Sequence, residues 1–355
     1  MKRKLEASIA ISILLALASC GDNSEEGGGE NGNQLPNIEF AKGADISWVT
    51  EFESKGYKFY DSNNFATECT QLMQNLGFNA CRYRVWVNPE DGWCNKEDVL
   101  VKAKRAQDLG MGIMIDFHYS DWWADPGKQV TPAAWSSYNV EEMTEAVAQH
   151  TEEVLNHLKN NGVSNVMWVQ VGNETNTGMI KPLGEVNSSN KGYNFIKFAN
   201  AAYDVIRKIY PQAKVILHHS NAQDLGRLQW FFNIMKAGGA RYDMIGLSLY
   251  PSYWDEKLGK HPDWKPYTIA AVNNFKTMHE TFGKDIMLVE FGMPEVQPEE
   301  SKAALEYILE NSRPNSWFKG VFYWEPESED ARNGYDYGAF HNGRPTIALD
   351  PFRAN

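Results

Sequence analysis

Apolar and polar positions along the chain follow a repeating rhythm of short strand-like runs and longer amphipathic stretches. Eight runs rich in apolar and β-branched residues have the length and composition typical of buried strands. They begin at Lys42, Asn79, Gly112, Asn165, Ala213, Tyr242, Ile286 and Gly320. Stretches with helical period lie between most of them, at residues 64–76, 98–109, 141–160, 194–210 and 301–312.

This alternation predicts a parallel sheet, because parallel strands need a crossover connection. Eight strand–helix units favour a single α/β domain, a (β/α)8 TIM barrel with long βα loops. A doubly wound open sheet is the alternative. Such a sheet usually has a glycine-rich phosphate-binding turn after its first strand, and the segment from Gly43 to Ser47 is not of that type.

The N-terminal segment is expected to be a targeting signal. Basic residues precede an apolar run that ends in Leu17 to Cys20, which resembles a bacterial lipoprotein signal. The resemblance implies that residues 1–19 are removed and that Cys20 is lipidated; an ordinary secretory signal is the alternative. Residues 20–38 are predicted to be a flexible tether and residues 39–355 the barrel. Acidic residues near Cys20 resemble surface-export signals of the Bacteroides group, which implies anchoring to the outer membrane and cell-surface exposure.

Charge and composition narrow the class of partner. The net charge is −12, which argues against nucleic acid, since a polyanion needs a basic surface. A content of 12 Trp, 16 Tyr and 17 Phe suits flat neutral rings such as sugars, besides a large core. Three cysteines follow the signal, Cys69, Cys81 and Cys94, so at most one disulfide can form, and their spacing does not resemble a zinc site.

Each predicted strand ends in a polar or aromatic residue, and in barrels this end carries the active site. These residues are Asp45, Arg84, His118, Glu174, His219, Tyr250, Glu290 and Glu325. Glu174 and Glu290 close apolar strands four and seven, so both are expected at one mouth. Two facing carboxyl groups are what glycoside hydrolysis requires, one protonated to assist the leaving oxygen and one ionised to attack the anomeric carbon.

Several segments resemble the arabinogalactan endo-β-1,4-galactanases of glycoside hydrolase family 53. The matching segments, spread over strands one to four and eight, are Gly43 to Ser47, Arg84 to Pro89, Asp116 to Gln129, Gln170 to Glu174 and Tyr323 to Pro326. The resemblance implies endo-cleavage of β-1,4-galactan with retention of configuration, without a required cofactor. It implies that Glu174 is the general acid/base and Glu290 the nucleophile. Another retaining β-1,4-glycanase and a non-catalytic glycan-binding surface protein are the alternatives.

The resemblance also implies roles for supporting residues. Asn173 is expected to bond the sugar 2-hydroxyl, and Arg84 to lie beside the nucleophile and lower its pKa, with Arg82 one layer deeper. Tyr250 is expected to hydrogen-bond the nucleophile, and Trp324 to stack under the sugar at the cleavage site.

Further substrate contacts are expected from the strand ends and the second and third βα loops. These are Asp45, His118, His219, Trp86, Trp123 and Asp125. His218 and His219 point to opposite faces of their strand, so they cannot chelate one metal together, and His219 is expected to face the site. Trp123 matches the family better than its neighbour Trp122.

Two departures from the family pattern lie near the expected cleft. Phe291, Gly292 and Met293 replace the usual Thr-Gly-Tyr, and Leu249 replaces a tyrosine. Both put subsite preference in doubt. The loop at residues 327–342 is shorter than in relatives that hold calcium there. A structural calcium ion stays open as an alternative that this short loop does not support, and no metal ligands are assigned. A monomer is expected.

Overall fold

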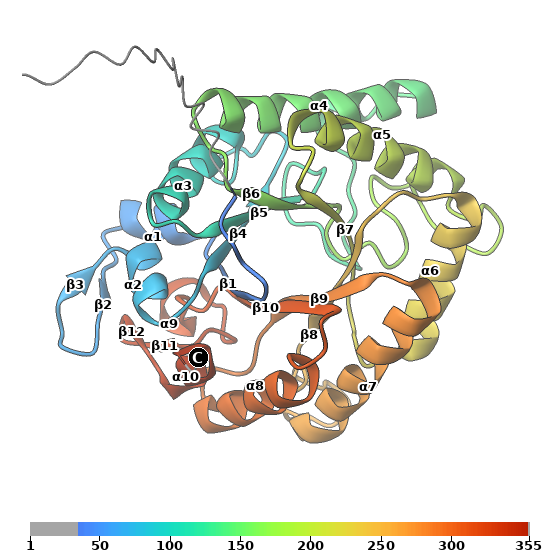
Figure 1. Cartoon of the computed structure of the whole chain (residues 1–355). Helices are drawn as coiled ribbons and strands as arrows, with labels where there is room; N and C mark the ends of the chain where they lie inside the picture. Colours follow the sequence, from blue (N-terminus) through green and yellow to red (C-terminus); the bar gives the residue numbers. More distant parts are fainter. Residues whose placement is uncertain (1–34, 354–355) are drawn as a thin grey trace, which may run out of the picture. The chain divides into compact units, whose positions relative to one another are not determined.

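The structure is a computed structural model that describes residues 35–353. The predicted signal, Cys20 and most of the predicted tether lie outside the described residues. Eight parallel strands form a closed barrel in the order β1-β10-β9-β8-β7-β6-β5-β4, which confirms the predicted (β/α)8 fold (Figure 1). The strands are β1 (Ala41–Asp45), β4 (Ala80–Val85), β5 (Gly112–Phe117), β6 (Val166–Val171), β7 (Lys214–His219), β8 (Met244–Leu249), β9 (Asp285–Phe291) and β10 (Phe318–Trp324).

The longer helices lie around this ring of strands (Figure 1). They are α3 (Lys96–Asp108), α4 (Val140–Asn160), α5 (Tyr193–Ile209), α6 (Leu225–Gly238), α7 (Trp264–Phe282) and α8 (Pro298–Ser312). Shorter helices are α1 (Val49–Ser54), α2 (Cys69–Asn75), α9 (Asp330–Asn333) and α10 (Asp350–Arg353), with 3-10 turns η1 (Ala133–Trp135) and η2 (Ile347–Leu349). Among the described residues, no helix is both long and apolar enough to cross a bilayer.

Two short antiparallel pairs complete the fold: β2 (Phe59–Tyr60) with β3 (Ala66–Thr67), and β11 (Phe340–His341) with β12 (Arg344–Pro345). Because of the β2–β3 pair, the predicted start of the helix at residue 64 is wrong. The helical pattern expected from residue 64 begins only at Cys69, because residues 66–67 pair with β2 and Glu68 caps the helix by accepting from the Gln71 N–H.

The barrel interior changes from apolar to polar along the strands. Every strand contributes to an apolar cluster inside the barrel: Ala41, Ala80, Met114, Trp168, Ile216, Met244, Met287, Val289 and Phe322. Phe322 fills the space beside Gly43, where an added Cβ would lie 2.2 Å from its ring. Two positions further along four strands, the same face carries buried polar residues, Arg82, Asp116, Gln170 and His218. The interior therefore becomes a polar base beneath the mouth at the strand C-termini.

Candidate active site

A cleft of about 370 Å³ opens above this polar base. Both predicted catalytic carboxyl groups, Glu174 and Glu290, line it. So do six other predicted site residues: His118, Trp123, Asp125, Asn173, Tyr250 and Trp324. Trp48, Lys128, Tyr253 and Tyr335 also line the cleft and were not predicted. A larger cavity at the opposite end of the barrel, around Phe40 and Trp168, lies away from these carboxyl groups.

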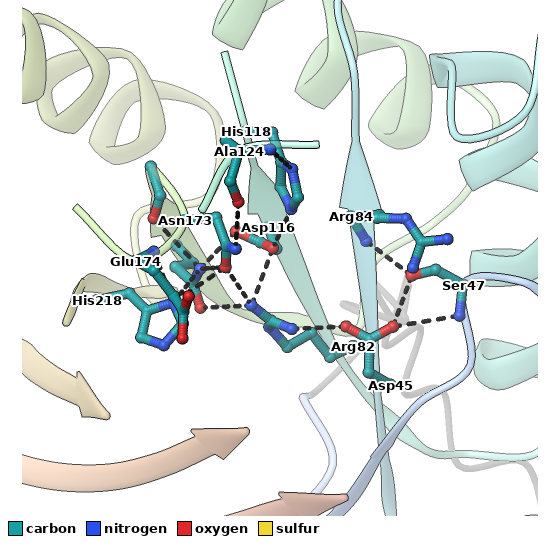
Figure 2. Close-up of polar contacts among 12 residues, drawn as sticks. Asp45, Ser47, Arg82, Arg84, Asp116, His118, Ala124, Asn173, Glu174 and His218 are labelled. Atoms are coloured by element: carbon teal, nitrogen blue, oxygen red, sulfur yellow. Dashed lines mark hydrogen bonds and ion pairs between the residues drawn. The ribbon is translucent and has the colours of Figure 1, made fainter. Parts of the chain in front are cut away.

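Arg82 is the centre of the polar base (Figure 2). One terminal nitrogen donates to Asp45 Oδ2 over 2.6 Å, and the other lies 2.9 Å from Asp116 Oδ2, Asn173 Oδ1 and Glu290 Oε1. Burial lowers the pKa of Arg82, but the surrounding carboxylates outweigh burial and raise the pKa above its ordinary value. Arg82, on β4, therefore stays charged and links residues from four other strands or strand ends.

Glu290 is almost fully buried, and both of its carboxylate oxygens have donors. Oε1 accepts from Arg82, and Oε2 accepts from the Tyr250 hydroxyl over 3.0 Å, as predicted. Burial raises the pKa of Glu290 to about 7, while the charge of Arg82 and the Tyr250 hydrogen bond act in the opposite direction. These two donors favour the ionised form and fix the rotamer of the side chain.

Glu174 is half-buried and follows the sharp turn at Gly172 and Asn173 at the end of β6. Its own backbone is in the left-handed region, with φ of 44°, a strained conformation often found at functional sites. Burial, followed by the charge of Glu290, raises its pKa to about 8. Because Glu290 has an arginine partner and Glu174 has none within hydrogen-bond distance, the first proton bound by the pair belongs on Glu174.

His218 holds the turn that carries Glu174. Its Nδ1 accepts from the Glu174 N–H at 3.1 Å and lies 3.0 Å from the Gln170 amide nitrogen. The proton is therefore assigned to Nε2, which donates to Ser248 Oγ over 2.6 Å. Burial, and then the charge of Arg82, lower the pKa of His218 well below its ordinary value, so the imidazole is neutral.

Aromatic rings form one wall of the cleft. The centroids of Trp48, Trp123 and Trp324 lie 5.3–5.8 Å apart, and Trp324 also contacts Tyr335 at 4.7 Å. Behind this wall, the Arg84 guanidinium lies 4.2 Å from the ring centroid of Trp123 and 5.0 Å from that of Trp48. Such a wall offers flat apolar faces beside the two carboxyl groups.

The predicted positions of Arg84 and His219 are wrong. Arg84 does not lie beside Glu290; it forms a buried ion pair with Glu325, and Arg82 occupies the predicted place. The long Arg82 side chain spans the barrel, whereas Arg84 lies under the tryptophans near β1. His219 faces away from the cleft and packs against Phe231 and Phe232, because it alternates with the inward-facing His218.

Two further predicted substrate contacts are also wrong. Asp45 is fully buried, and its oxygens are used by Arg82 and by the N–H and hydroxyl of Ser47. Trp86 is only 2% exposed, and its indole N–H donates to His118 Nδ1 over 3.2 Å. Asp45 and Trp86 are therefore buried residues that hold Arg82 and His118 in position.

Glu174, His218 and Glu290 form the one group of three candidate metal ligands found among the described residues, with one ligand atom of each within 4.8 Å of the others. Both His218 nitrogens have hydrogen-bond partners within the protein, so neither has a lone pair free for a metal. All three remaining cysteines are unpaired and buried, and none touches the cleft.

The chain is similar to known proteins over most of its length. The model of glycosyl hydrolase family 53 matches residues 41–344. A relative from Neosartorya fischeri, named probable arabinogalactan endo-β-1,4-galactanase A, is 34% identical over 80% of this chain and 83% of its own length. The arabinogalactan endo-β-1,4-galactanase of Thermothelomyces thermophilus is 30% identical over 80% of this chain and 89% of its own. A solved structure from work on two fungal β-1,4-galactanases has a TM-score of 0.78 and 29% identity, covering 87% of this chain and 98% of that chain. The chain therefore belongs to glycosyl hydrolase family 53 and is a glycoside hydrolase.

Proposed function

We propose that this glycoside hydrolase cleaves internal β-1,4-galactosidic bonds of galactan and type I arabinogalactan with retention of configuration. The observation that carries the proposal is the carboxyl pair: an oxygen of Glu174 and an oxygen of Glu290 lie within 4.8 Å of each other in the cleft. Retaining glycosidases hold their two carboxyl groups about 5–5.5 Å apart, whereas inverting ones need about 6.5–9.5 Å for a water. The proposed specificity for galactan is based on the names of the two relatives, both of which are named as arabinogalactan endo-β-1,4-galactanases.

In the first step, Glu290 attacks the anomeric carbon while Glu174 donates its proton to the glycosidic oxygen. The bond from the anomeric carbon to that oxygen breaks, the shortened chain leaves, and an ester joins the sugar to Glu290. In the second step, Glu174 takes a proton from water, and the water oxygen attacks the anomeric carbon. Glu290 is released as a carboxylate, Glu174 is protonated again, and two inversions give net retention. No step calls for a metal or cofactor, so chelation should leave the rate unchanged.

The polar base and the aromatic wall supply the remaining functions. Arg82 and Tyr250 keep Glu290 ionised, and His218 holds the backbone of Glu174. Asn173 is held by its contacts with Arg82 and Ala124, lines the cleft, and is the proposed partner of the sugar 2-hydroxyl. Trp324 and Trp123 provide stacking faces for the sugar ring.

The test is incubation of the purified protein with linear β-1,4-galactan, following chain length and product anomer by NMR. We expect a rapid fall in chain length and initial release of the β-anomer. Glu290→Ala should abolish hydrolysis while galactan binding persists. Unchanged activity of this variant would rule out Glu290 as the nucleophile. A wild type that binds galactan without hydrolysing it would favour a non-catalytic glycan-binding protein. Azide should partly rescue Glu174→Ala on an activated aryl glycoside, with a β-glycosyl azide as product. Preference for β-1,4-mannan or β-1,4-glucan would favour the alternative glycanase.

We further propose that Cys20 is lipidated and that the enzyme is anchored to the outer membrane and exposed at the cell surface. The motif that ends at Cys20 and the polar segment after it support this. Cys20→Ser should move the protein from the membrane fraction to the soluble fraction and abolish labelling by a fatty-acid analogue. Protease treatment of intact cells tests exposure, since a periplasmic enzyme would be protected.

A further inference from the structure

A second hollow continues the cleft beyond Glu174. It has a volume of about 740 Å³ and shares four lining residues with the cleft: Asp125, Glu174, Tyr250 and Tyr253. Its far side is made by the segment after β8, including Trp254, and by Tyr267 at the start of α7. The two hollows therefore form one continuous surface, with Glu174 at their junction.

Three aromatic side chains that line this hollow are unusually exposed. Tyr253 is 62%, Trp254 46% and Tyr267 37% accessible to solvent. Exposed aromatic groups gathered in one hollow are typical of ligand-binding surfaces, because a core role would bury them.

The segment that carries two of these rings is held in place by packing and hydrogen bonds. Tyr253 stacks on Tyr337 with ring centroids 5.2 Å apart and an interplanar angle of 20°. The Trp254 N–H donates to the Tyr337 hydroxyl oxygen over 2.8 Å, and the Trp254 ring contacts the edge of His261 at 5.2 Å. His261 in turn donates to the Ser252 carbonyl over 2.8 Å. The rings are thus preorganised while remaining accessible, which lowers the entropic cost of stacking a ligand on them.

The position of the hollow relative to the two carboxyl groups identifies what binds there. Glu174 lines it, but Glu290 does not. The sugar whose anomeric carbon is attacked must contact Glu290, and the oxygen that receives the proton must contact Glu174. The part of the substrate beyond that oxygen is the leaving group, so the hollow lies on the leaving-group side of the scissile bond.

We propose that Tyr253, Trp254 and Tyr267 form a stacking platform for the sugar units on the leaving-group side of the cleaved bond. This inference rests on the proposed retaining mechanism with Glu174 as the acid. The same platform would seat the acceptor sugar when the ester on Glu290 is transferred to a saccharide instead of to water. In that transfer, Glu174 takes the proton of the acceptor hydroxyl, whose oxygen bonds the anomeric carbon as the Glu290 ester breaks.

The charges around the hollow favour a neutral sugar chain. Its lining contains four carboxyl residues and one lysine: Asp125, Glu174, Asp255, Glu256 and Lys257. An acidic polysaccharide would be repelled by this excess of negative charge, whereas neutral galactosyl units can stack and hydrogen-bond without an ionic partner.

The experiment compares two substrates in Trp254→Ala and Tyr267→Ala, since these two rings line the second hollow but not the cleft. One is a long β-1,4-galacto-oligosaccharide labelled at its reducing end, and the other is a 4-nitrophenyl β-1,4-galactotrioside. Release of 4-nitrophenol from the second substrate is followed, because this cleavage places no sugar on the leaving-group side. We expect kcat/KM on the oligosaccharide to fall about three- to tenfold per ring removed. The aryl substrate should be hydrolysed at close to the wild-type rate, and the ratio of saccharide transfer to hydrolysis should fall.

Two control variants keep the result specific. Trp254→Phe retains an aromatic face and should restore most of the lost activity. Leu258→Ala alters an exposed residue of the same segment, 57% accessible, that does not line the hollow, and it should behave as wild type. Equal loss on both substrates, or no loss on either by a folded variant, would overturn the platform while leaving the galactanase proposal intact. An inactive wild type on galactan would instead refute the proposed function.

Discussion

Arg82 and Glu290 meet across the barrel, with a guanidinium nitrogen 2.9 Å from Glu290 Oε1, although they come from strands β4 and β9. Both are buried, and the same arginine also pairs with Asp45 and Asp116. Because the charge of Arg82 lowers the pKa of Glu290, this contact keeps the proposed nucleophile ionised.

Replacing Arg82 should therefore damage activity and stability together. Arg82→Met leaves buried carboxylates without a partner, and breaking such a pair costs about 3–5 kcal/mol. Arg82→Lys keeps the charge but cannot reach Asp45 and Glu290 together, so it should recover stability better than activity. Urea unfolding and kcat/KM across pH measure both effects, and an acidic limb of the pH profile unmoved in Arg82→Lys would contradict the assigned role.

The pH profile of kcat/KM should be bell-shaped, with an optimum near neutral pH. Glu290 must be ionised, so activity is lost as pH falls through the lower apparent pKa of the pair. Glu174 must be protonated, so activity is lost as pH rises through the upper one. Burial raises both values, to about 7 for Glu290 and about 8 for Glu174, and the pair titrates as a unit. A profile flat from mildly acidic to strongly alkaline pH would rule out this pairing.

Tyr250→Phe should move mainly the acidic limb. The lost hydrogen bond stabilises ionised Glu290, so its pKa should rise and the limb should shift to higher pH. The shift should be about one pH unit, because a hydrogen bond to a charged group is worth about 1.5–3 kcal/mol and one pKa unit corresponds to about 1.4 kcal/mol. Tyr193→Phe, on the exposed surface of α5, is the matched control and should leave the profile unchanged.

The adjacent histidines should respond in opposite ways to the same substitution. His218→Phe removes the acceptor for the Glu174 N–H, and an unpaired buried donor costs about 1–3 kcal/mol, so kcat/KM should fall by roughly five- to a hundredfold. His219→Phe adds a ring to the apolar contacts with Phe231 and Phe232 and should leave kcat/KM close to wild type. A larger loss of kcat/KM in His219→Phe than in His218→Phe would contradict this assignment and indicate that His219 faces the site.

Arg84 and Glu325 should behave as a coupled pair that supports the aromatic wall. Arg84→Met leaves Glu325 buried without its cation and should destabilise the fold, while the double variant Arg84→Met, Glu325→Gln should be less destabilised. KM should rise in both, because Trp123 loses the guanidinium beside its ring. A double-mutant cycle by urea unfolding measures the coupling, and strictly additive losses would contradict it.

The barrel and the two carboxyl groups could be predicted because each rests on a local pattern. Glu174 and Glu290 both close apolar strands, and parallel strands must bring their ends to one mouth. The choice between Arg82 and Arg84 could not be made in this way. The two share one face of β4, and only the three-dimensional reach of each side chain decides which one meets Glu290.

The sequence shows that His218 and His219 point to opposite sides of β7, but it does not show which of them faces the site. Ile216 lies on the inner face of β7, so alternation places His218 inside and His219 outside, but the sequence does not say which face of a strand buried on both sides is inner. The burial of Trp86 depends on how the loops of residues 86–95 and 118–135 pack on each other, which no local pattern encodes.

The salt-bridged cluster around Arg82 is built from strand residues and strand ends, whereas Tyr253 and Trp254 belong to a connecting segment. The proposed bond-breaking residues and the proposed binding site for the departing chain thus belong to different parts of the fold. Exchanging the segment after β8 between members of the family should alter the lengths of the fragments released without disturbing how the bond itself is cut.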